Sequence, residues 1–280
     1  MSIEEVHPKS QFLRDERLPH IWCPGCGLGI VLQSYINAAE KSGIRLENHV
    51  LISGIGCTAR LPGYANLDTY HTTHGRGIPF ATGMKIANPD LKVTVISGDG
   101  DLFNIGGNHF IHAARRNMDL LVVCVNNFNY GMTGGQHGST TPPSSLSSST
   151  PYGNIEQSFN LPYLAAAIGA SYVARWTVMH PRQFTKSLSK AMDIRGFAFV
   201  EVLSPCPPNF GKFNGFSDGF AEMEFYRKNS VVDNEAKLED VSIDPHHGKQ
   251  IILGEFVNKR RPSFIELERE VNRRAMVVEK

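Results

Sequence analysis

Two stretches of the sequence place oxygen-bearing side chains directly after apolar runs. Asp99 follows the run 91–97, and Asn127 follows the run 120–125. A carboxylate, a neutral amide oxygen and a nearby backbone carbonyl form a hard oxygen set, which suits Mg²⁺ held partly by phosphates. The sequence therefore predicts a magnesium and diphosphate site that contains Asp99 and Asn127.

The cysteines offer a second kind of chemistry. Cys23 and Cys26 form a Cys-x-x-Cys motif before a predicted helix, which is typical of a redox dithiol, half a zinc site or half an iron-sulfur site. Cys57 and Cys206 each follow a predicted strand, whereas Cys124 lies inside one and is interpreted as a buried, unreactive thiol. Structural zinc sites usually have two close pairs, so one pair and two distant cysteines favour a cluster without excluding zinc.

The elements that position these residues follow from the apolar pattern. The β-branched runs 91–97 and 120–125, separated by a helix over 106–117, predict a βαβ unit in a buried parallel sheet. Ligands of such sheets bind outside the carboxyl ends of the strands, so Asp99 and Asn127 should converge. The predicted fold class is α/β, a mostly parallel sheet with helices on both faces. Further helices are predicted over 28–39, 161–168, 181–193 and 263–279, and further strands over 51–56, 171–175 and 197–203.

The Gly-Asp-Gly motif, followed after a helix and a strand by Asn-Asn, resembles the thiamine diphosphate fingerprint. The resemblance implies that Asp99, Asn127 and the main-chain carbonyl of Asn129 bind Mg²⁺, which bridges the diphosphate. The alternative is a surface turn with two asparagines at a strand end, because Gly-Asp-Gly alone is an ordinary turn signal.

Three cysteine segments extend the resemblance: Trp-Cys-Pro-Gly-Cys-Gly, Gly-Ile-Gly-Cys-Thr and Ser-Pro-Cys-Pro-Pro. Together with the diphosphate motif they resemble the β subunit of 2-oxoacid:ferredoxin oxidoreductases, in the same order along the chain. In that family four cysteines hold a 4Fe-4S cluster close to thiamine diphosphate. The implied ligands here are Cys23, Cys26, Cys57 and Cys206, and the implied cofactors are thiamine diphosphate, Mg²⁺ and the cluster.

The family also suggests which residues line the cofactor site. His74, in a His-Gly-Arg loop, is expected to contact the diphosphate, although a solvated surface loop is the alternative; His71, His109 and His112 are given no functional role. The loop 134–153 opens like an active-site segment of the family and is then expected to be a flexible lid. The predicted cofactor-binding residues are Ile55, Gly56, Cys57, Thr58, His74, Gly98, Asp99, Gly100, Asp101, Asn127, Asn129, Gly131, Met132 and Thr133.

The resemblance implies oxidative decarboxylation of a 2-oxo acid, with electrons passing through the cluster to ferredoxin and the acyl group to coenzyme A. The segments Arg17-Leu-Pro-His-Ile-Trp-Cys and Tyr130-Gly-Met-Thr-Gly-Gly-Gln are most similar to 2-oxoglutarate-using members, which form succinyl-CoA, while pyruvate and branched-chain acids stay open. The glutamate that activates thiamine has no counterpart that we identify. An α subunit is expected to supply it, so the isolated chain should be inactive.

Composition sets the remaining limits. The chain has 280 residues, 41% of them hydrophobic, and a formal net charge of +1, which gives no indication of a nucleic-acid or anionic membrane partner. No apolar run reaches the ~18 residues of a membrane span, and no secretory signal is evident, so a cytoplasmic location is expected. We expect an arm over 1–20, a cofactor domain over 21–210 and a C-terminal extension over 211–280 that contacts a partner.

Two other functions remain open. A non-oxidative thiamine-dependent decarboxylase subunit would share the diphosphate motif but would not need four cysteines. A zinc-stapled α/β binding module would use the cysteines but not the diphosphate motif.

Overall fold

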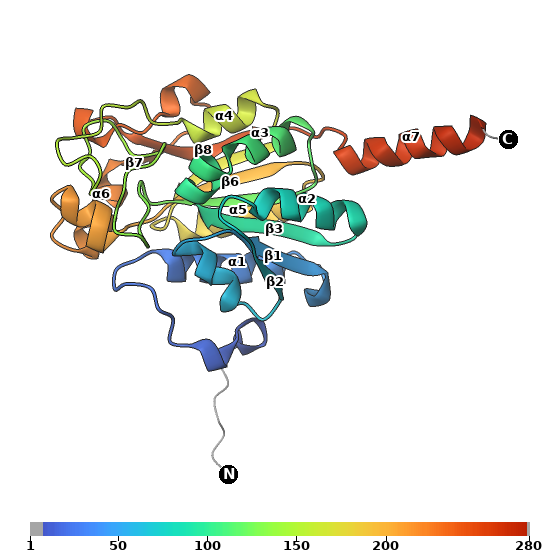
Figure 1. The fold of residues 1–280 in the computed structure, drawn as a ribbon, viewed down its shortest axis with the longest axis horizontal. Coiled ribbons are helices and arrows are strands. Elements are labelled where there is room, and N and C mark those ends of the chain that lie inside the picture. Colours follow the sequence, from blue (N-terminus) through green and yellow to red (C-terminus); the bar gives the residue numbers. More distant parts are fainter. Residues whose placement is uncertain (1–7, 279–280) are drawn as a thin grey trace, which may run out of the picture.

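The computed structural model describes residues 8–278 and is organised around one twisted eight-stranded sheet (Figure 1). The strand order is β2-β1-β3-β4-β6-β5-β8-β7, and neighbouring strands run parallel except β5 and β8. The predicted α/β class is confirmed. The strands are β1 (His49–Ser53), β2 (Asp68–His71), β3 (Lys92–Gly98), β4 (Leu121–Asn126), β5 (Tyr172–Thr177), β6 (Ala198–Leu203), β7 (Ser230–Val232) and β8 (Ile251–Asn258).

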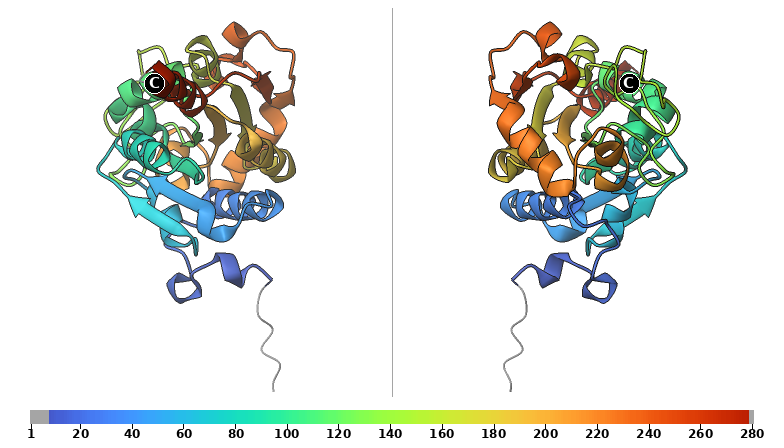
Figure 2. Two further views of the ribbon diagram at one scale, coloured as in Figure 1. Left: turned by 90° about the vertical axis from the view of Figure 1, so that its right-hand side faces the viewer. Right: turned by 90° about the vertical axis from the view of Figure 1, so that its left-hand side faces the viewer.

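Helices cover both faces of the sheet, as the two side views in Figure 2 show. Helices α1 and α5 pack in one apolar core, and α2, α3 and α4 pack in a second core on the opposite face. This layering explains why the central strands are apolar along their whole length. The helices are α1 (Leu28–Lys41), α2 (Gly77–Ala87), α3 (Gly107–Arg115), α4 (Leu161–Ala167), α5 (Pro181–Asp193), α6 (Gly219–Asn229) and α7 (Phe264–Val278).

The predicted βαβ unit is present. Strands β3 and β4 are parallel neighbours, with Thr94 opposite Leu121, and α3 connects them. Parallel pairing places the carboxyl ends of β1, β3, β4 and β6 at one edge of the sheet. The loops that follow these four strands therefore meet, and they contain the predicted ligands Cys57, Asp99, Asn127 and Cys206.

A buried ion pair ties the last quarter of the chain to this sheet. The Arg175 Nε donates to Glu201 Oε2 at 2.6 Å between neighbouring strands, and Nη1 of the same arginine donates to the carbonyl oxygen of Val241 at 2.5 Å. The Asn126 amide donates to the second Glu201 oxygen at 2.8 Å. Because every partner is satisfied, these polar groups are retained in an otherwise apolar core.

The sequence analysis missed three strands. We expected a tail or partner-binding surface after residue 210, but β8 pairs antiparallel with β5, and β7 pairs with β8, so both extend the sheet. The mixed charge around 233–250 hid the short apolar run of β8. The third, β2, is an exposed four-residue edge strand. The predicted helical tail is α7, which projects from the body (Figure 1).

The first residues differ from the expected extended arm where they are described. Residues 1–7 lie outside the described part, and two short 3₁₀ turns follow at Ser10–Phe12 and Asp15–Arg17. Phe12 is buried in the core, and Leu13 forms a β-bridge with Ala65. The buried Phe12 ring and backbone hydrogen bonds, such as Arg14 N–H to the Tyr64 carbonyl at 2.9 Å, together anchor this segment to the body.

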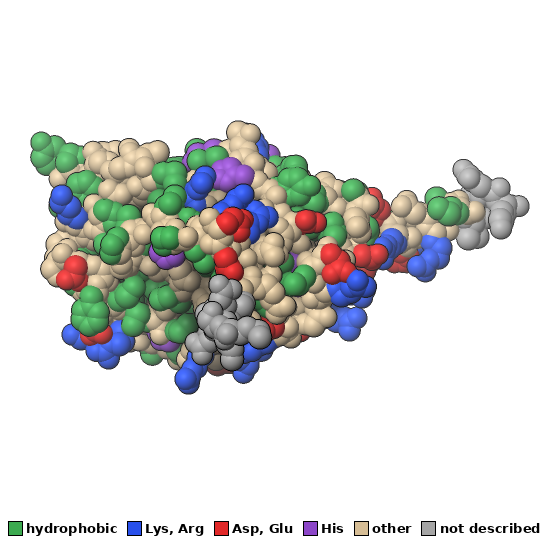
Figure 3. All heavy atoms as spheres, turned by 90° about the horizontal axis from the view of Figure 1, so that it is seen from below, with side chains coloured by type: hydrophobic (Ala, Val, Ile, Leu, Met, Phe, Trp, Pro, Cys, Tyr) green, Lys and Arg blue, Asp and Glu red, His purple; other side chains and the backbone are tan. Residues whose placement is uncertain are grey.

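The surface is mixed in charge. On the face shown in Figure 3, acidic and basic side chains are interspersed, and both run along the projecting helix α7. This agrees with the small net charge of the chain. Over residues 8–278, we find no helix with the length and hydropathy that crossing a bilayer requires.

Buried His49 on β1 should make the stability of the fold pH-dependent. Burial, followed by the nearby Lys92 ammonium, lowers the pKa of His49 from 6.5 to about 4. A lowered pKa in the folded state means that stability is complete above about pH 6.5 and is lost as the pH falls toward 4. Between pH 8 and pH 5 this histidine should remove about 2 kcal/mol from the free energy of unfolding.

Chemical denaturation of the wild type and of His49→Gln at both pH values checks this. The difference in unfolding free energy between the two proteins should change by about 2 kcal/mol as the pH falls from 8 to 5. A difference that stays constant across the range would show that His49 does not contribute.

Candidate active site

The predicted cofactor residues line one cavity at the carboxyl edge of the sheet. Its volume is about 90 Å³. The lining consists of every residue predicted above to bind the cofactor, together with Tyr130, which the sequence analysis did not single out. His71, His109 and His112 are not among the lining residues. The cavity therefore gathers side chains from four loops that lie up to 78 positions apart in the sequence, from Ile55 to Thr133.

Three oxygen-bearing groups converge in this cavity. The side-chain amide of Asn127 lies 2.7 Å from the Asn129 carbonyl oxygen and 3.2 Å from Asp99 Oδ1. With its nitrogen on that side, the amide donates to both oxygens; with its oxygen there, three oxygens face one another and call for a cation between them. The donor set thus fits the predicted Mg²⁺.

Asp99 is held in place by a threonine from a distant loop. The Thr140 hydroxyl donates to Asp99 Oδ2, and the carboxylate is almost fully buried. Burial raises the pKa of Asp99 to about 6, and the hydrogen bond from Thr140 opposes this shift. A buried carboxylate of this kind gains stability from a neighbouring positive charge.

Phe128 sets the direction of the two asparagines that flank it. Its φ of 63° lies in the left-handed region, which is unfavourable for a bulky residue. The backbone is held there by a hydrogen bond from Phe128 N to Asn126 Oδ1 at 3.0 Å and by one from the Thr141 hydroxyl to the Phe128 carbonyl at 2.6 Å. This backbone conformation brings the Asn127 side-chain amide and the Asn129 carbonyl to the same side of the loop.

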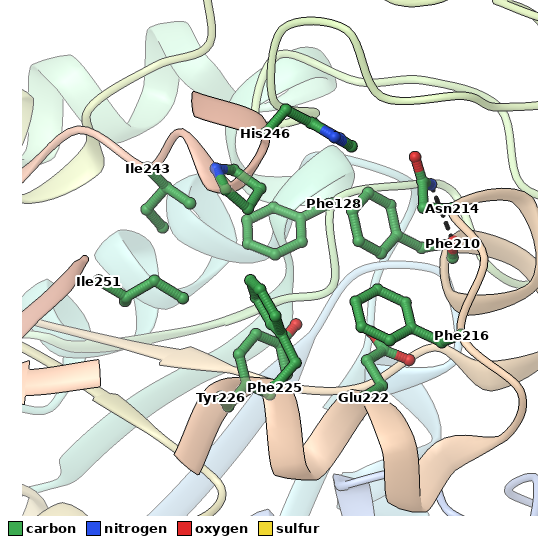
Figure 4. Close-up of a pocket in the computed structure, with 11 residues that line it drawn as sticks. Phe128, Phe210, Asn214, Phe216, Glu222, Phe225, Tyr226, Ile243, His246 and Ile251 are labelled. Atoms are coloured by element: carbon green, nitrogen blue, oxygen red, sulfur yellow. Dashed lines mark hydrogen bonds between the residues drawn. The ribbon is translucent and has the colours of Figure 1, made fainter. Parts of the chain in front are cut away.

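The ring of Phe128 lines a second, apolar cavity of about 150 Å³ (Figure 4). It packs against the Phe210 ring at a centroid distance of 5.1 Å. Phe216, Phe225 and Ile243 complete much of the wall. This packing stabilises the strained backbone of the asparagine loop from behind.

The four cysteines predicted as cluster ligands gather beside the cofactor cavity. Burial raises the pKa of the Cys26 thiol to about 12, and the nearby thiols of Cys206, Cys57 and Cys23 contribute to the rise. Cys206 Sγ lies 3.7 Å from Asn129 Oδ1, which connects the cysteines to the loop of Asn127 and Asn129. Cys124 is fully buried inside β4 and stays apart from the others, as its position in a strand predicted.

In the described part of the chain, no three His, Cys, Asp or Glu side chains lie close enough together to hold a single metal ion. A cubane places each thiolate on a different iron atom, so its ligands stand farther apart than those of one zinc ion. The thiols are close enough for their charges to raise the pKa of Cys26 and of Cys57. Cys57 also borders the cofactor cavity.

Local contacts hold the cysteine segments in position. The Trp22 indole donates to the Cys57 carbonyl at 2.9 Å, which joins the Cys-x-x-Cys loop to the turn after β1. Gly25, with φ of 79°, lies against Gly219, and a Cβ at Gly25 would stand 2.9 Å from that backbone. The buried carboxylate of Glu222 accepts the backbone N–H of Cys206 at 3.1 Å. Each cysteine segment is thus tied to a neighbouring one or to α6.

The loop 134–153 differs from the flexible lid that we expected. Thr140, Thr141, Ser145 and Ser147 are buried, and the Asn154 amide donates to the Thr141 carbonyl at 2.8 Å. The serine and threonine hydroxyls replace the hydrogen bonds that regular secondary structure would provide. The loop is therefore a packed wall of the site. Thr140 was missed because no periodicity marks it.

Comparisons with known proteins agree with this geometry. The family model described as "Thiamine pyrophosphate enzyme, C-terminal TPP binding domain" matches residues 54–202. The chain is 49% identical over 261 residues to 2-oxoglutarate synthase subunit KorB of Methanocaldococcus jannaschii, which covers 93% of this chain and 96% of the relative. It is 50% identical over 260 residues to the subunit of the same name from Methanothermobacter thermautotrophicus, covering 93% and 90%. The chain belongs to the family of 2-oxoacid:ferredoxin oxidoreductase β subunits.

A solved structure also supports the assignment of this chain to the β-subunit family. The structure is 2-oxoglutarate:ferredoxin oxidoreductase from Magnetococcus marinus with 2-oxoglutarate, coenzyme A and succinyl-CoA bound. It superposes with a TM-score of 0.85 at 32% identity and covers 97% of this chain and 91% of that one. The predicted family and the thiamine diphosphate-binding fold are therefore confirmed.

Gly100 offers a test of the cavity walls. A Cβ at this position would stand 2.6 Å from the ring of Tyr130, whereas a Cβ at Gly107 meets no atom within 4 Å. Gly100→Ala should displace the ring into the cavity and weaken binding of magnesium and thiamine diphosphate about tenfold, because overpacking a tight site costs on the order of 1–3 kcal/mol.

Calorimetric titration of the assembled enzyme measures the effect. Gly107→Ala is the matched control and should bind as the wild type does. Equal affinities for both variants would mean that Tyr130 is not part of the cofactor wall.

Proposed function

We propose that this chain is the β subunit of an enzyme that converts 2-oxoglutarate and coenzyme A to succinyl-CoA and carbon dioxide and passes the electrons to ferredoxin. The observation that carries the proposal is the meeting of an oxygen-rich cation site and four thiols at one edge of the sheet. The 2-oxoglutarate synthase subunits, nearly half identical over almost the full chain, support the choice of substrate.

The residues present fit the three expected cofactors. Asp99, Asn127 and the carbonyl of Asn129 would hold Mg²⁺, which bridges the diphosphate. Cys23, Cys26, Cys57 and Cys206 would hold a 4Fe-4S cluster. When bound, thiamine diphosphate supplies the nucleophilic carbon and electron sink for the loss of carbon dioxide, and the cluster accepts electrons one at a time.

The chain itself orients and shields these groups. In the Gly98-Asp99-Gly100 turn, Gly98 leaves room for a diphosphate close to the backbone, because a Cβ there would meet no atom nearer than 3.7 Å. Loop 134–153 closes one side of the cavity through Thr140 on Asp99. Gly134 in this loop has φ of 110°, a conformation that residues other than glycine adopt only with strain.

An α subunit is needed because the site is incomplete. The cavity of about 90 Å³ is much smaller than the roughly 300–1,000 Å³ of complete small-molecule sites. Apolar side chains are exposed at its rim, Ile55 and Met132, and on the adjoining loop, Tyr152 and Ile155. Exposed apolar groups around an open site are typical of a protein interface. We assign this rim to the α subunit, which would bring the activating glutamate.

The exposed position of Cys23 offers a route for electrons from a bound cluster to the protein surface. Cys23 is exposed, while Cys26 and Cys57 are partly covered and Cys206 is buried against the asparagine loop. A cluster held by these four residues would reach the thiamine site on one side and the protein surface on the other. This arrangement suits transfer to a one-electron carrier such as ferredoxin.

The proposed reaction is tested by reconstitution. The chain assembled with its α subunit should reduce a viologen dye only when 2-oxoglutarate and coenzyme A are both present, and the chain alone should be inactive. Turnover by the chain alone would contradict the shared site. Dye reduction with pyruvate in place of 2-oxoglutarate would contradict the substrate.

The cluster ligands are tested by iron and sulfide analysis. Cys206→Ser should lose most of the cluster and its absorbance, since a hydroxyl is a poor substitute for a thiolate on iron. Cys124→Ala, which removes the buried fifth cysteine, should keep full iron content. A zinc-containing, iron-free protein would favour the zinc-stapled module, and a protein with thiamine diphosphate but neither iron nor zinc would favour the non-oxidative decarboxylase.

A further inference from the structure

Asp101 lies at the floor of the cavity with a side chain that is only 1% exposed. Its Oδ1 accepts the backbone N–H groups of Ile55 at 3.0 Å and Gly75 at 2.7 Å, and it lies 2.5 Å from His74 Nδ1. Its Oδ2 accepts the hydroxyl of Ser97 at 2.8 Å. Both carboxylate oxygens are thus occupied by donors of the protein itself. Asp101 also borders the cavity, and few of its lone pairs remain for the cofactor contact that the sequence analysis predicts.

The four donors come from three separate parts of the site. Ile55 begins the turn that carries Cys57, and His74 with Gly75 forms the loop before α2. Ser97 lies at the end of β3, two residues before Asp99. One carboxylate therefore connects a cluster ligand, a residue expected at the diphosphate and the magnesium-binding turn.

The contact between Asp101 and the end of β1 is tight. A Cβ added at Gly54 would stand 2.1 Å from Asp101 Oδ2 and 2.2 Å from Oδ1, so only glycine leaves room for the carboxylate. Gly75, whose N–H binds Asp101 Oδ1, is itself closely packed, because a Cβ there would stand 2.6 Å from a side-chain atom of Ile105. A shift of the Asp101 carboxylate therefore has to move the turn after β1 and the loop before α2 with it.

The same contact orients the imidazole of His74. With Nδ1 directed at Asp101, Nε2 is the ring nitrogen left for a ligand in the cavity. The ring also stands edge-on to Tyr130, with centroids 6.2 Å apart. A carboxylate behind a histidine commonly fixes the direction of the ring toward its ligand.

We propose that Asp101 is a positioning residue that sets the diphosphate end of the cavity and the iron-sulfur cluster relative to each other. It acts through His74 on one side and through the turn of Ile55 and Cys57 on the other. The identity of the two groups rests on the proposed function. The consequence is that a displaced Asp101 carboxylate disturbs cofactor binding and the cluster together.

Two substitutions distinguish the effect of the position of the Asp101 carboxylate from the effect of its charge. Gly54→Ala keeps the charge of Asp101 but pushes the carboxylate away, while Asp101→Asn keeps the shape and removes the charge. Gly83→Ala in α2 is the matched control, since a Cβ there meets no atom within 4 Å. All variants are studied in the enzyme assembled with its α subunit.

Two measurements are made on each assembled variant. The first is the affinity for magnesium and thiamine diphosphate. The second, made without thiamine diphosphate, is the electron paramagnetic resonance spectrum and midpoint potential of the reduced cluster. The second measurement does not depend on turnover.

Gly54→Ala and Asp101→Asn should each weaken thiamine diphosphate binding about tenfold or more, as loss of a charge-assisted hydrogen bond does. Both should also change the cluster spectrum and potential, and Gly83→Ala should change neither. A cluster potential altered only in Asp101→Asn would reflect charge alone and would overturn the proposal. So would a Gly54→Ala enzyme with an unaltered cluster.

Ser97→Ala covers the case in which Gly54→Ala does not fold. It removes one of the four donors to Asp101, so it should weaken thiamine diphosphate binding and change the cluster spectrum and potential, each less than Gly54→Ala does. Wild-type values for both would overturn the proposal. Iron and thiamine content of the wild type are measured first. Their absence would contradict the proposed function, whereas their presence with unresponsive variants contradicts only the role of Asp101.

Discussion

A close set of polar groups at the ends of β3 and β4 is the constraint on which this site depends. The Asn127 side-chain amide stands between Asp99 Oδ1 and the Asn129 carbonyl oxygen, and these two oxygens have to be matched by the amide nitrogen or by a cation. The surrounding structure keeps the three groups in place: Phe128 holds a strained backbone, Thr140 binds the carboxylate and an aromatic cavity supports the loop from behind. Together these features fix the positions of the three groups relative to one another.

The four cysteines Cys23, Cys26, Cys57 and Cys206 are positioned by the same edge of the sheet. Cys57 and Cys206 follow β1 and β6, which flank the β3 and β4 pair, and the Cys-x-x-Cys loop is attached to Cys57 through the indole of Trp22. The contact between Cys206 and Asn129 joins the two halves of the site directly. Because both halves are built on rigid strand ends, their separation is determined by the spacing of strands in the sheet.

Motifs with both a fixed spacing and flanking apolar runs could be predicted from the sequence. The Gly-Asp-Gly turn and the asparagine pair were placed correctly because parallel strands direct their carboxyl ends to one edge, and the helix over 181–193 was predicted with its observed bounds. Contacts set by tertiary structure could not be predicted. Nothing in the order of residues links Thr140 to Asp99, or shows that Asp101 accepts hydrogen bonds from three separate parts of the site. The strand β8 was hidden because antiparallel pairing to β5 depends on a partner about 80 positions away.

The two outer strands of the sheet have a consequence for how this chain assembles. At one end β2 has four residues, and at the other β7 has three, so each border offers only a few unpaired backbone groups. Short outer strands resist edge-to-edge aggregation, because a neighbouring chain finds too little backbone to continue the ladder. Oligomers of this protein are therefore expected to form through side chains on loops and helices, and the sheet itself ends within each subunit.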